Sequence, residues 1–296
     1  LGELEWVLGM HLSRDRRRRT IKLDQERYIQ KLAERFFGDD RPHKTKVMTP
    51  ALHGKVLTKE MNASTPQLVA EMADKPYRAL VGSLLFATVC TRPDLSQAVG
   101  VLCRFQQNPG AEHWKAAKRA LRYAVGTASI GLTFGGGSKT FELAGWCDAD
   151  YAGDLDTRRS TTGYVFYLCG GVISYKSMLQ KAVTLSTCEA EYSAAAQAAR
   201  EAVWTLALVN EIGKDELPTP VNIHEDNQGT IALSKNPVGH GKNKHIDIKK
   251  HFLRELTEKG AIALSYTPTL EQIADIFTKA LPQPRFLELR KLLMGV

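Results

Sequence analysis

The 296-residue sequence is poor in cysteine and has no long apolar run. Its five cysteines are odd in number and form no Cys-x-x-Cys pair, which argues against a disulfide framework or a zinc ribbon and favours a reducing compartment. No apolar stretch approaches the roughly 20 residues of a membrane-spanning helix, and no signal peptide precedes the first strand pattern. We therefore expect a cytoplasmic, intracellular protein with no membrane partner.

Acidic residues are scarce in the first part of the chain. Residues 1–140 carry 23 Lys and Arg against 13 Asp and Glu, whereas residues 141–296 carry 17 against 19. A basic surplus of this kind indicates a polyanion partner such as nucleic acid. For the run RDRRRR at 14–19 taken alone, a solvated hairpin turn is the better interpretation.

The composition is that of an ordinary globular protein, with 43% hydrophobic and 24% charged residues, and the length suffices for two domains. The sequence starts at Leu1 and is at once inside the strand-like pattern LEWVLGMHL. A piece of a longer polypeptide would start in this way, so we expect further protein upstream of Leu1.

The first 140 residues predict a hairpin followed by helices. Apolar and polar residues alternate at 4–12 and 20–23, which is typical of two strands joined by the charged turn. Helical periodicity recurs in four segments, at 24–36, 76–90, 94–108 and 112–126. The stretch 39–75 is rich in Lys, Thr, Pro and Asn, and we interpret it as a linker or extended arm.

After residue 140 the pattern becomes that of an α/β domain. Three strand-length runs rich in β-branched and aromatic residues precede a long helix at 187–212. A strand, two helices, a strand and a helix follow, at 221–227, 228–236, 247–260, 261–268 and 271–281. This order predicts a mixed sheet flanked by helices, with domains at 1–140 and 141–296.

Four acidic residues stand where ligands gather in such a sheet. Asp148 and Asp226 follow predicted strands, Glu191 lies on the long helix, and Asp275 lies on the last helix. Converging carboxylates repel one another unless a cation lies between them. Oxygen ligands with no partnering cysteine favour Mg²⁺ or Mn²⁺ over zinc.

Two glutamates in the segment TCEAEY have different expected roles. Ser186 and Glu189 form a capping-box pattern at the start of the long helix. Glu191 points about 200° away and shares a face with Ala194, Ala195 and Ala198. A charge on such a closely packed face needs compensation, which a metal ion would provide. In the alternative interpretation, both glutamates are exposed at the helix start and stabilised by the helix dipole; without the other three acids, this interpretation would be the better one.

Together these segments carry a family resemblance. The strings DADYAGDLDTRRSTTGYVF, LSTCEAEY, EDNQGTIAL, KHIDIKKHF and YTPTLEQIADIFTK resemble the ribonuclease H domain of copia-type LTR retrotransposon polyproteins. Upstream, LGMHLSRDRRRRTIKLDQERYIQKL and YRALVGSLLFATVCTRPDLSQAVGVLCRF resemble the end of the reverse transcriptase and its connecting helices. The resemblance implies a ribonuclease H-like mixed five-stranded sheet, preceded by a hairpin and mainly helical thumb and connection regions.

By this resemblance, the chain is a metal-dependent endonuclease that hydrolyses the RNA strand of RNA–DNA hybrids. Its catalytic and metal-binding set would be Asp148, Glu191, Asp226 and Asp275, holding two Mg²⁺ ions, with Mn²⁺ as a possible substitute. Asp247 competes for the fourth place, although a helix N-cap role suits it better. Lys242, Lys244, Lys249 and Lys250 form a candidate nucleic-acid contact strip, or a solvated charge run. The family also implies a virus-like particle as the intracellular location.

The segment FGDD at 37–40 mimics the aspartate pair of a reverse transcriptase, but an amphipathic helix precedes it, so we interpret it as a helix end. The polymerase aspartates are then expected upstream of Leu1, in a polymerase portion that would be a partner of this chain. The principal alternative is a non-enzymatic remnant of a truncated polyprotein that binds nucleic acid. An integrase-type nuclease would need a late-helix Glu where Asp275 stands.

Overall fold

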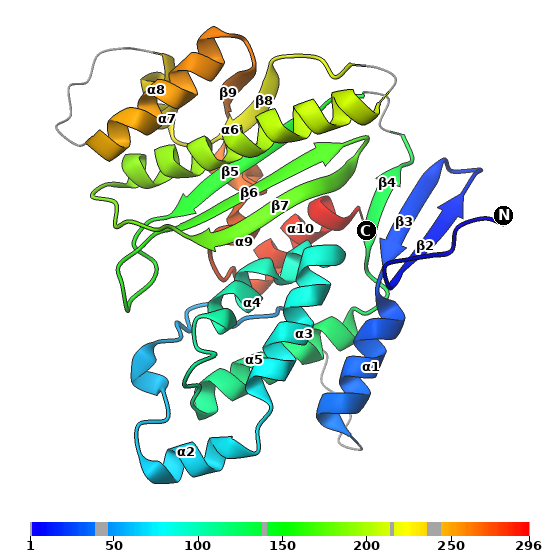
Figure 1. Ribbon diagram of the computed structural model, residues 1–296, viewed down its shortest axis with the longest axis vertical. Helices are drawn as coiled ribbons and strands as arrows, with labels where there is room; N and C mark the ends of the chain where they lie inside the picture. Colours follow the sequence, from blue (N-terminus) through cyan, green and yellow to red (C-terminus); the bar gives the residue numbers. More distant parts are fainter. Residues whose placement is uncertain (1, 39–46, 138–140, 214–215, 236–243, 296) are drawn as a thin grey trace. The chain divides into compact units, whose positions relative to one another are not determined.

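The computed structural model describes residues 2–38, 47–137, 141–213, 216–235 and 244–295, with 244–250 as backbone alone (Figure 1). The chain forms two compact units, Leu1–Thr133 with Ala280–Val296, and Phe134–Lys279. The predicted domain boundary after residue 140 stays a prediction. The C-terminal segment from Ala280, which the sequence pattern had joined to the α/β part, belongs to the first compact unit.

The second unit is built on a mixed five-stranded sheet in the order β7-β6-β5-β8-β9. Its strands β5, β6 and β7 are antiparallel neighbours, whereas β8 runs parallel to both β5 and β9. The strands are Ala144–Asp150, Thr161–Leu168, Gly171–Leu179, Val221–Glu225 and Ile262–Tyr266. The predicted fold class, an α/β protein with a mixed five-stranded sheet flanked by helices, is confirmed.

Alternation along β5 and β6 determines which helix covers which face of the sheet. Cys147 lies opposite Tyr164, and both belong to the core that the alanine face of α6 (Thr187–Ile212) completes. The next pair, Asp148 and Gly163, points to the other face because successive side chains alternate. There, a Cβ atom on Gly163 would lie within 3.0 Å of atoms of α9 (Asp275–Thr278), so this position requires glycine. Helices α6 and α9 therefore cover opposite faces.

The remaining helices of this unit are α7 (Gln228–Lys235) and α8 (Lys244–Glu258). The predicted helix over 271–281 is wrong in extent, since the chain forms a short 3₁₀ turn at Thr269–Glu271 and then α9. Between them, Gln272 turns inward, where its Nε2 donates to the Cys147 carbonyl at 2.9 Å and its Oε1 accepts from the Ala274 N–H at 3.2 Å. These bonds attach the segment to β5 and interrupt the helix.

The first unit begins with the predicted hairpin, which is confirmed by β2 (Met10–Asp15) and β3 (Thr20–Asp24). The strand expected over 4–12 is broken at Leu8 and Gly9, which both have positive φ angles, so that β1 (Trp6–Val7) folds back on β2. Strand β4 (Leu132–Gly135), in which the chain passes from the first unit into the second, completes the order β1-β2-β3-β4.

Among the helices of the first unit are α1, α3, α4, α5 and α10, at Glu26–Phe37, Tyr77–Cys90, Ser96–Cys103, Ala111–Gly126 and Gln283–Met294. Helix α1 ends at Phe37, and the Gly38 N–H donates to the Glu34 carbonyl, as expected for a helix end at FGDD. Asp39 and Asp40 lie outside the described residues. None of the described helices has the length and apolarity needed to cross a membrane.

One helix interrupts the segment that we interpreted as a linker. Helix α2 (Pro66–Ala73) starts after Thr65, whose side chain accepts a hydrogen bond from the Leu68 N–H at 3.2 Å. Proline at the first helical position supports this start because its missing N–H would have no partner there. The linker interpretation of 39–75 is therefore wrong for these residues.

A buried ionic network joins the helices of the first unit. Arg92 and Asp94 are fully buried, and the guanidinium donates two hydrogen bonds to the carboxylate, at 2.9 and 2.8 Å. The Tyr123 hydroxyl donates to the same carboxylate at 2.5 Å and accepts from Arg290 of α10 at 3.3 Å. Helix α10 thereby takes part in the interior of this unit.

Candidate metal centre

The parallel pairing of β5 with β8 brings two aspartates side by side. Ala144 lies opposite Asn222 and Trp146 opposite His224; two residues further along come Asp148, within β5, and Asp226, which directly follows β8. Thr269, from the turn after β9, donates its hydroxyl to Asp226 Oδ2 at 2.9 Å.

The first turns of α6 present the third carboxylate. Ser186 caps the helix by accepting from the Glu189 N–H at 3.1 Å, and Glu189 Oε2 accepts from the Leu185 N–H at 2.7 Å. The predicted capping role of Glu189 is confirmed, with Leu185 as the residue that it reaches. Glu191 is only 8% exposed, because the alanines on its face are fully buried and allow the helix to approach the sheet closely.

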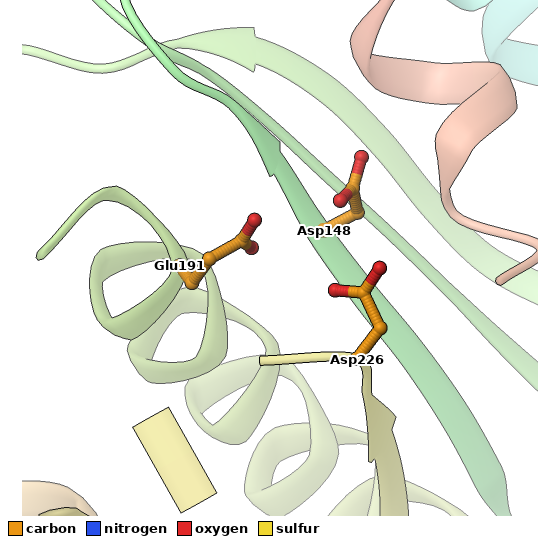
Figure 2. A group of neighbouring side chains, drawn as sticks. All are labelled: Asp148, Glu191 and Asp226. Atoms are coloured by element: carbon orange, nitrogen blue, oxygen red, sulfur yellow. The ribbon is translucent and has the colours of Figure 1, made fainter. Parts of the chain in front are cut away.

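These three acids converge from three elements of the chain. One carboxylate oxygen from each of Asp148, Glu191 and Asp226 lies within 4.8 Å of the others. Figure 2 shows Glu191 extending from the helix toward the two aspartates at the ends of their strands. We call this group the three-carboxylate centre. Hard oxygen ligands at this separation are the donor set that Mg²⁺ or Mn²⁺ prefers.

Burial and mutual repulsion disfavour the ionised forms of these acids. Burial, with the nearby Asp275 and Asp226 charges, raises the pKa of Asp148 to about 7, although Lys279 and Thr278 oppose the shift. Burial, followed by the charge of Asp148, raises the pKa of Glu191 to about 11. Without a cation, the centre holds protons that an isolated carboxylate releases well below neutral pH.

An unpartnered oxygen indicates what the centre accommodates. Glu191 Oε2 is buried and makes no hydrogen bond with the described part of the protein. A buried carboxylate oxygen without a donor is unfavourable by about 1–3 kcal/mol or more, so such atoms point to a missing ligand. A divalent cation between the three carboxylates would supply both the bond and the positive charge. The residues present therefore fit a metal ion.

The fourth predicted acid lies beside this centre with a lysine as its partner. Asp275 Oδ1 is 2.5 Å from Lys279 Nζ, and the same ammonium lies 4.0 Å from Asp148 Oδ2. The Thr278 hydroxyl donates to Asp148 Oδ2 at 2.5 Å. Burial disfavours the charged lysine, but the Asp148 and Asp275 carboxylates outweigh it and raise the pKa of Lys279 to about 12. Asp275 is not one of the three acids that converge.

Glu225 is a further buried acid that the sequence interpretation overlooked. It is 0% exposed, accepts from the Cys147 thiol at 3.1 Å and from the Asn227 N–H at 3.1 Å. Burial raises its pKa to about 8. A signal existed, since Glu225 continues the alternation of the buried Val221 and Ile223 and so had to face the core.

The predicted lysine strip is only partly within the described chain. Lys242 lies outside the described residues, and Lys244, Lys249 and Lys250 fall in the part of α8 that is described by backbone alone, as does Asp247. Their roles stay predictions. Lys279 and Thr278 were also missed, although the spacing Asp-x-x-x-Lys in DIFTK is an i,i+4 ion-pair pattern on a helix.

Comparison with solved structures gives remote similarity. LC11-RNase H1 in complex with an RNA/DNA hybrid has a TM-score of 0.35 and 13% identity, covering 46% of this chain and 94% of that one. The foamy viral protease-reverse transcriptase in complex with RNA/DNA hybrid has a TM-score of 0.35 and 16% identity, covering 50% of this chain and 20% of that one. No protein-family model matches the chain.

Curated relatives are much more similar in sequence. The retrovirus-related Pol polyprotein from transposon TNT 1-94 of Nicotiana tabacum is 43% identical over 296 residues, which are 100% of this chain and 22% of that protein. The polyprotein from transposon RE1 of Arabidopsis thaliana is 37% identical over 289 residues, 96% of this chain and 18% of that protein. The chain spans about a fifth of the length of these relatives. With such identity along nearly its whole length, the chain belongs to the family of retrovirus-related Pol polyproteins from transposons.

Proposed function

We propose that the second unit is a metal-dependent endoribonuclease that cleaves the RNA strand of RNA–DNA hybrids, as part of a copia-type retrotransposon polyprotein. The observation that carries this proposal is the convergence of Asp148, Glu191 and Asp226 within 4.8 Å, with a buried Glu191 oxygen that lacks a partner. Membership of the Pol polyprotein family supports the same activity.

The acidic side chains would hold a divalent cation next to the phosphate of the RNA strand that is to be cleaved. Asp148, Glu191 and Asp226 would hold Mg²⁺ or Mn²⁺, and Asp275 completes the acidic set on the α9 side. Such ions activate water for attack and stabilise the leaving 3′ oxygen when bound. Thr278 would fix the orientation of Asp148 through its hydroxyl, and Thr269 that of Asp226.

The hybrid would be selected by its backbone and shape. Proteins that recognise RNA contact the 2′-hydroxyl groups and phosphates, and lysines near the site neutralise the phosphate charge. The unit would therefore act on duplexes that contain an RNA strand, and the remaining polymerase part of the polyprotein would supply that substrate. The family implies that this takes place inside the cell, in a virus-like particle.

Cleavage of a labelled RNA–DNA hybrid tests the proposal. The chain should cut the RNA strand with Mg²⁺, and Asp148→Asn or Asp226→Asn should abolish cleavage while hybrid binding stays unchanged. Glu189→Gln is the matched control, because Glu189 only caps the helix two residues before Glu191. Metal-dependent cleavage by the aspartate variants would contradict the proposal.

A non-enzymatic remnant that binds nucleic acid is the alternative. The basic surplus of residues 1–140 favours binding irrespective of catalysis. This alternative predicts that the parent chain binds the hybrid as tightly as the aspartate variants do and that none of them cleaves it at any Mg²⁺ or Mn²⁺ concentration.

A further inference from the structure

Helix α6 of the second unit carries an exposed stripe on the side turned away from the sheet. This long helix lies along the sheet, and its alanine face is buried there (Figure 1). The exposed residues Arg200, Trp204, Ala207 and Glu211 follow one another at spacings of four, three and four residues. Residues three and four apart are neighbours on a helix surface, so these side chains form one row, which we call the outer seam.

The outer seam is apolar at its middle. Trp204 is 58% exposed, and Val203 and Leu208, which are its neighbours on the helix, are also exposed. Single apolar residues are common on protein surfaces, whereas a contiguous apolar patch with charged residues at its borders marks an interaction site. Here Arg200 borders the patch at one end and Glu211 at the other. This arrangement indicates a protein partner for the outer face of α6.

A second copy of the same helix, laid antiparallel, complements the outer seam. In an interface with two-fold symmetry, a contact between two different residues occurs twice, once in each direction. With the axis at the middle of the seam, Arg200 lies opposite Glu211 of the second copy, and Trp204 lies opposite Ala207. Opposite charges therefore meet at both ends of the seam, and between them the largest side chain meets the smallest one.

The flanking apolar residues pair about the same axis. Val203 lies opposite Leu208 of the second copy, so apolar side chains meet on both sides of the seam. A parallel arrangement loses these pairings, because Arg200 would face Arg200 and Glu211 would face Glu211, and like charges repel. Within the part of the chain that the structure describes, neither Arg200 nor Glu211 forms an ion pair, so both charges are available to a partner.

We propose that the outer seam is a homodimer interface, in which a second copy of this chain packs antiparallel through two Arg200–Glu211 ion pairs, with the Trp204 ring on Ala207 between them. Such a dimer would form whether or not the chain is a nuclease. On an ideal helix Glu191 and Glu211 point about 160° apart, so the second copy would pack on the side of α6 opposite to the three-carboxylate centre. Each dimer would then carry two such centres.

The seam is short, which limits the strength of the dimer. Two helices in contact over about three turns bury less than the roughly 800 Å² per partner of a standard protein interface, so we expect a dissociation constant in the micromolar range. Exposed ion pairs contribute little to affinity, but like charges that face each other strongly disfavour association. Charge reversal therefore tests this interface more sharply than truncation of a charged side chain.

Sedimentation equilibrium of the full chain, from about 1 to 200 µM, measures the dissociation constant of the dimer. The variants are Arg200→Glu, Glu211→Arg, the double variant that exchanges the two charges, and Trp204→Ala, which removes the ring. Glu258→Arg is the matched control, because this exposed residue at the end of α8 undergoes the same charge change as Glu211→Arg but lies outside the seam. Circular dichroism establishes that each variant is folded.

We expect the parent and Glu258→Arg to form the same dimer. Each single reversal places like charges at both ends of the seam and should weaken association at least about tenfold, as should Trp204→Ala, whereas the double variant should return to within about threefold of the parent.

Three results would overturn the inference. They are a parent that stays monomeric at the highest concentration, as when another part of the polyprotein covers the seam, a dimer that the single reversals leave unchanged, and a double variant as weak as the single ones. Hybrid cleavage by a monomeric parent would remove the dimer and keep the nuclease proposal, and a dimer that does not cleave the hybrid would do the reverse.

Discussion

Replacing Glu191 by glutamine separates two effects of this side chain: the loss of folding stability caused by burying an acid, and its proposed role as a metal ligand. In the metal-free chain the pKa of Glu191 is raised from its ordinary value of 4.5 to about 11, chiefly by burial. The folded chain therefore keeps a proton at neutral pH that the unfolded chain releases. Because the folded state binds more protons, its free energy of unfolding falls as the pH rises above 4.5.

The magnitude follows from the distance between the working pH and the ordinary pKa. Each pH unit contributes about 1.4 kcal/mol, so over the 2.5 units between 4.5 and 7 the protonation of Glu191 lowers the free energy of unfolding by about 3.5 kcal/mol at most. Glutamine needs no proton and has nearly the same shape. We expect Glu191→Gln to raise the melting temperature of the metal-free chain by up to roughly 5–10 °C at pH 7, and by only about 1–2 °C at pH 5.

In the presence of Mg²⁺, the parent chain should have the higher melting temperature and Glu191→Gln the lower one, the reverse of the metal-free order. Mg²⁺ at about 100 times its dissociation constant stabilises the parent by about 2.7 kcal/mol, and Glu191→Gln should lose most of this shift. Glu189→Gln, which affects only the helix cap, should lower the melting temperature slightly at every pH and keep the Mg²⁺ shift. Scanning calorimetry at pH 5, 7 and 8, with chelator and with Mg²⁺, provides the measurement. If Glu191→Gln is less stable than the parent in chelator at pH 8, or gains equally from Mg²⁺, the account of this centre is wrong.

Three further changes test the packing around the centre and in the first unit, each by chemical denaturation. Gly163→Ala should destabilise the second unit by about 1–3 kcal/mol, because the new Cβ would lie 2.7 Å from Phe277 Cβ and would push α9 from the sheet; unchanged stability would contradict this packing. Gly82→Ala, in an exposed turn of α3 where a Cβ meets nothing within 4 Å, should stabilise the chain by about 0.5–1 kcal/mol, and a loss of stability would show that helix propensity does not limit this position. Tyr123→Phe should cost about 1–3 kcal/mol by removing the donor to the buried Asp94, and an unaltered unfolding midpoint would mean that Arg92 alone satisfies that carboxylate.

The sequence predicted correctly those helices and strands whose formation depends on residues close to one another in the chain. The long helix was predicted with its observed bounds, since the cap at Ser186 and the alanine face are both visible in the sequence. The separation of Glu189 from Glu191 followed from helix geometry alone. The strand that contains Asp148 was recognised from its β-branched and aromatic composition, and the strand before Asp226 was also predicted. Their parallel pairing, which brings the two aspartates near each other, is long-range.

Long-range hydrogen bonds account for what the sequence did not predict near the centre. The interruption between Glu271 and Asp275 arises from Gln272, whose partner Cys147 is 125 residues away. The hydrophobic periodicity of residues 271–281 alone cannot predict a hydrogen bond to a residue so far away in the sequence. The ion pair between Asp275 and Lys279 has an ordinary helical spacing, but its approach to Asp148 depends on the same distant attachment.

Two helices were missed for a different reason. The starts of α2 and α10 both carry a proline in the first turn, and α10 also has Phe286, Leu289 and Leu293 at helical spacing. These signals are local and were available. The assignment of the segment after residue 280 to the α/β part came from its position in the sequence, whereas its apolar face packs with the interior that includes Tyr123.

The return of the C-terminal segment to the first unit makes the α/β unit an insertion with two covalent connections. The chain leaves the first unit after Thr133 and re-enters it at Ala280. A protease that cuts the first connection separates residues 1–133 covalently from the rest, but the segment after Ala280 stays joined to the α/β unit and, by packing with the first unit, keeps the two fragments associated. Conversely, a stop codon just after Lys279 would spare every carboxylate of the metal centre and still deprive the other unit of Phe286, Leu289 and Arg290. Genetic truncations of such elements would then impair first the part of the protein that lies earlier in the sequence.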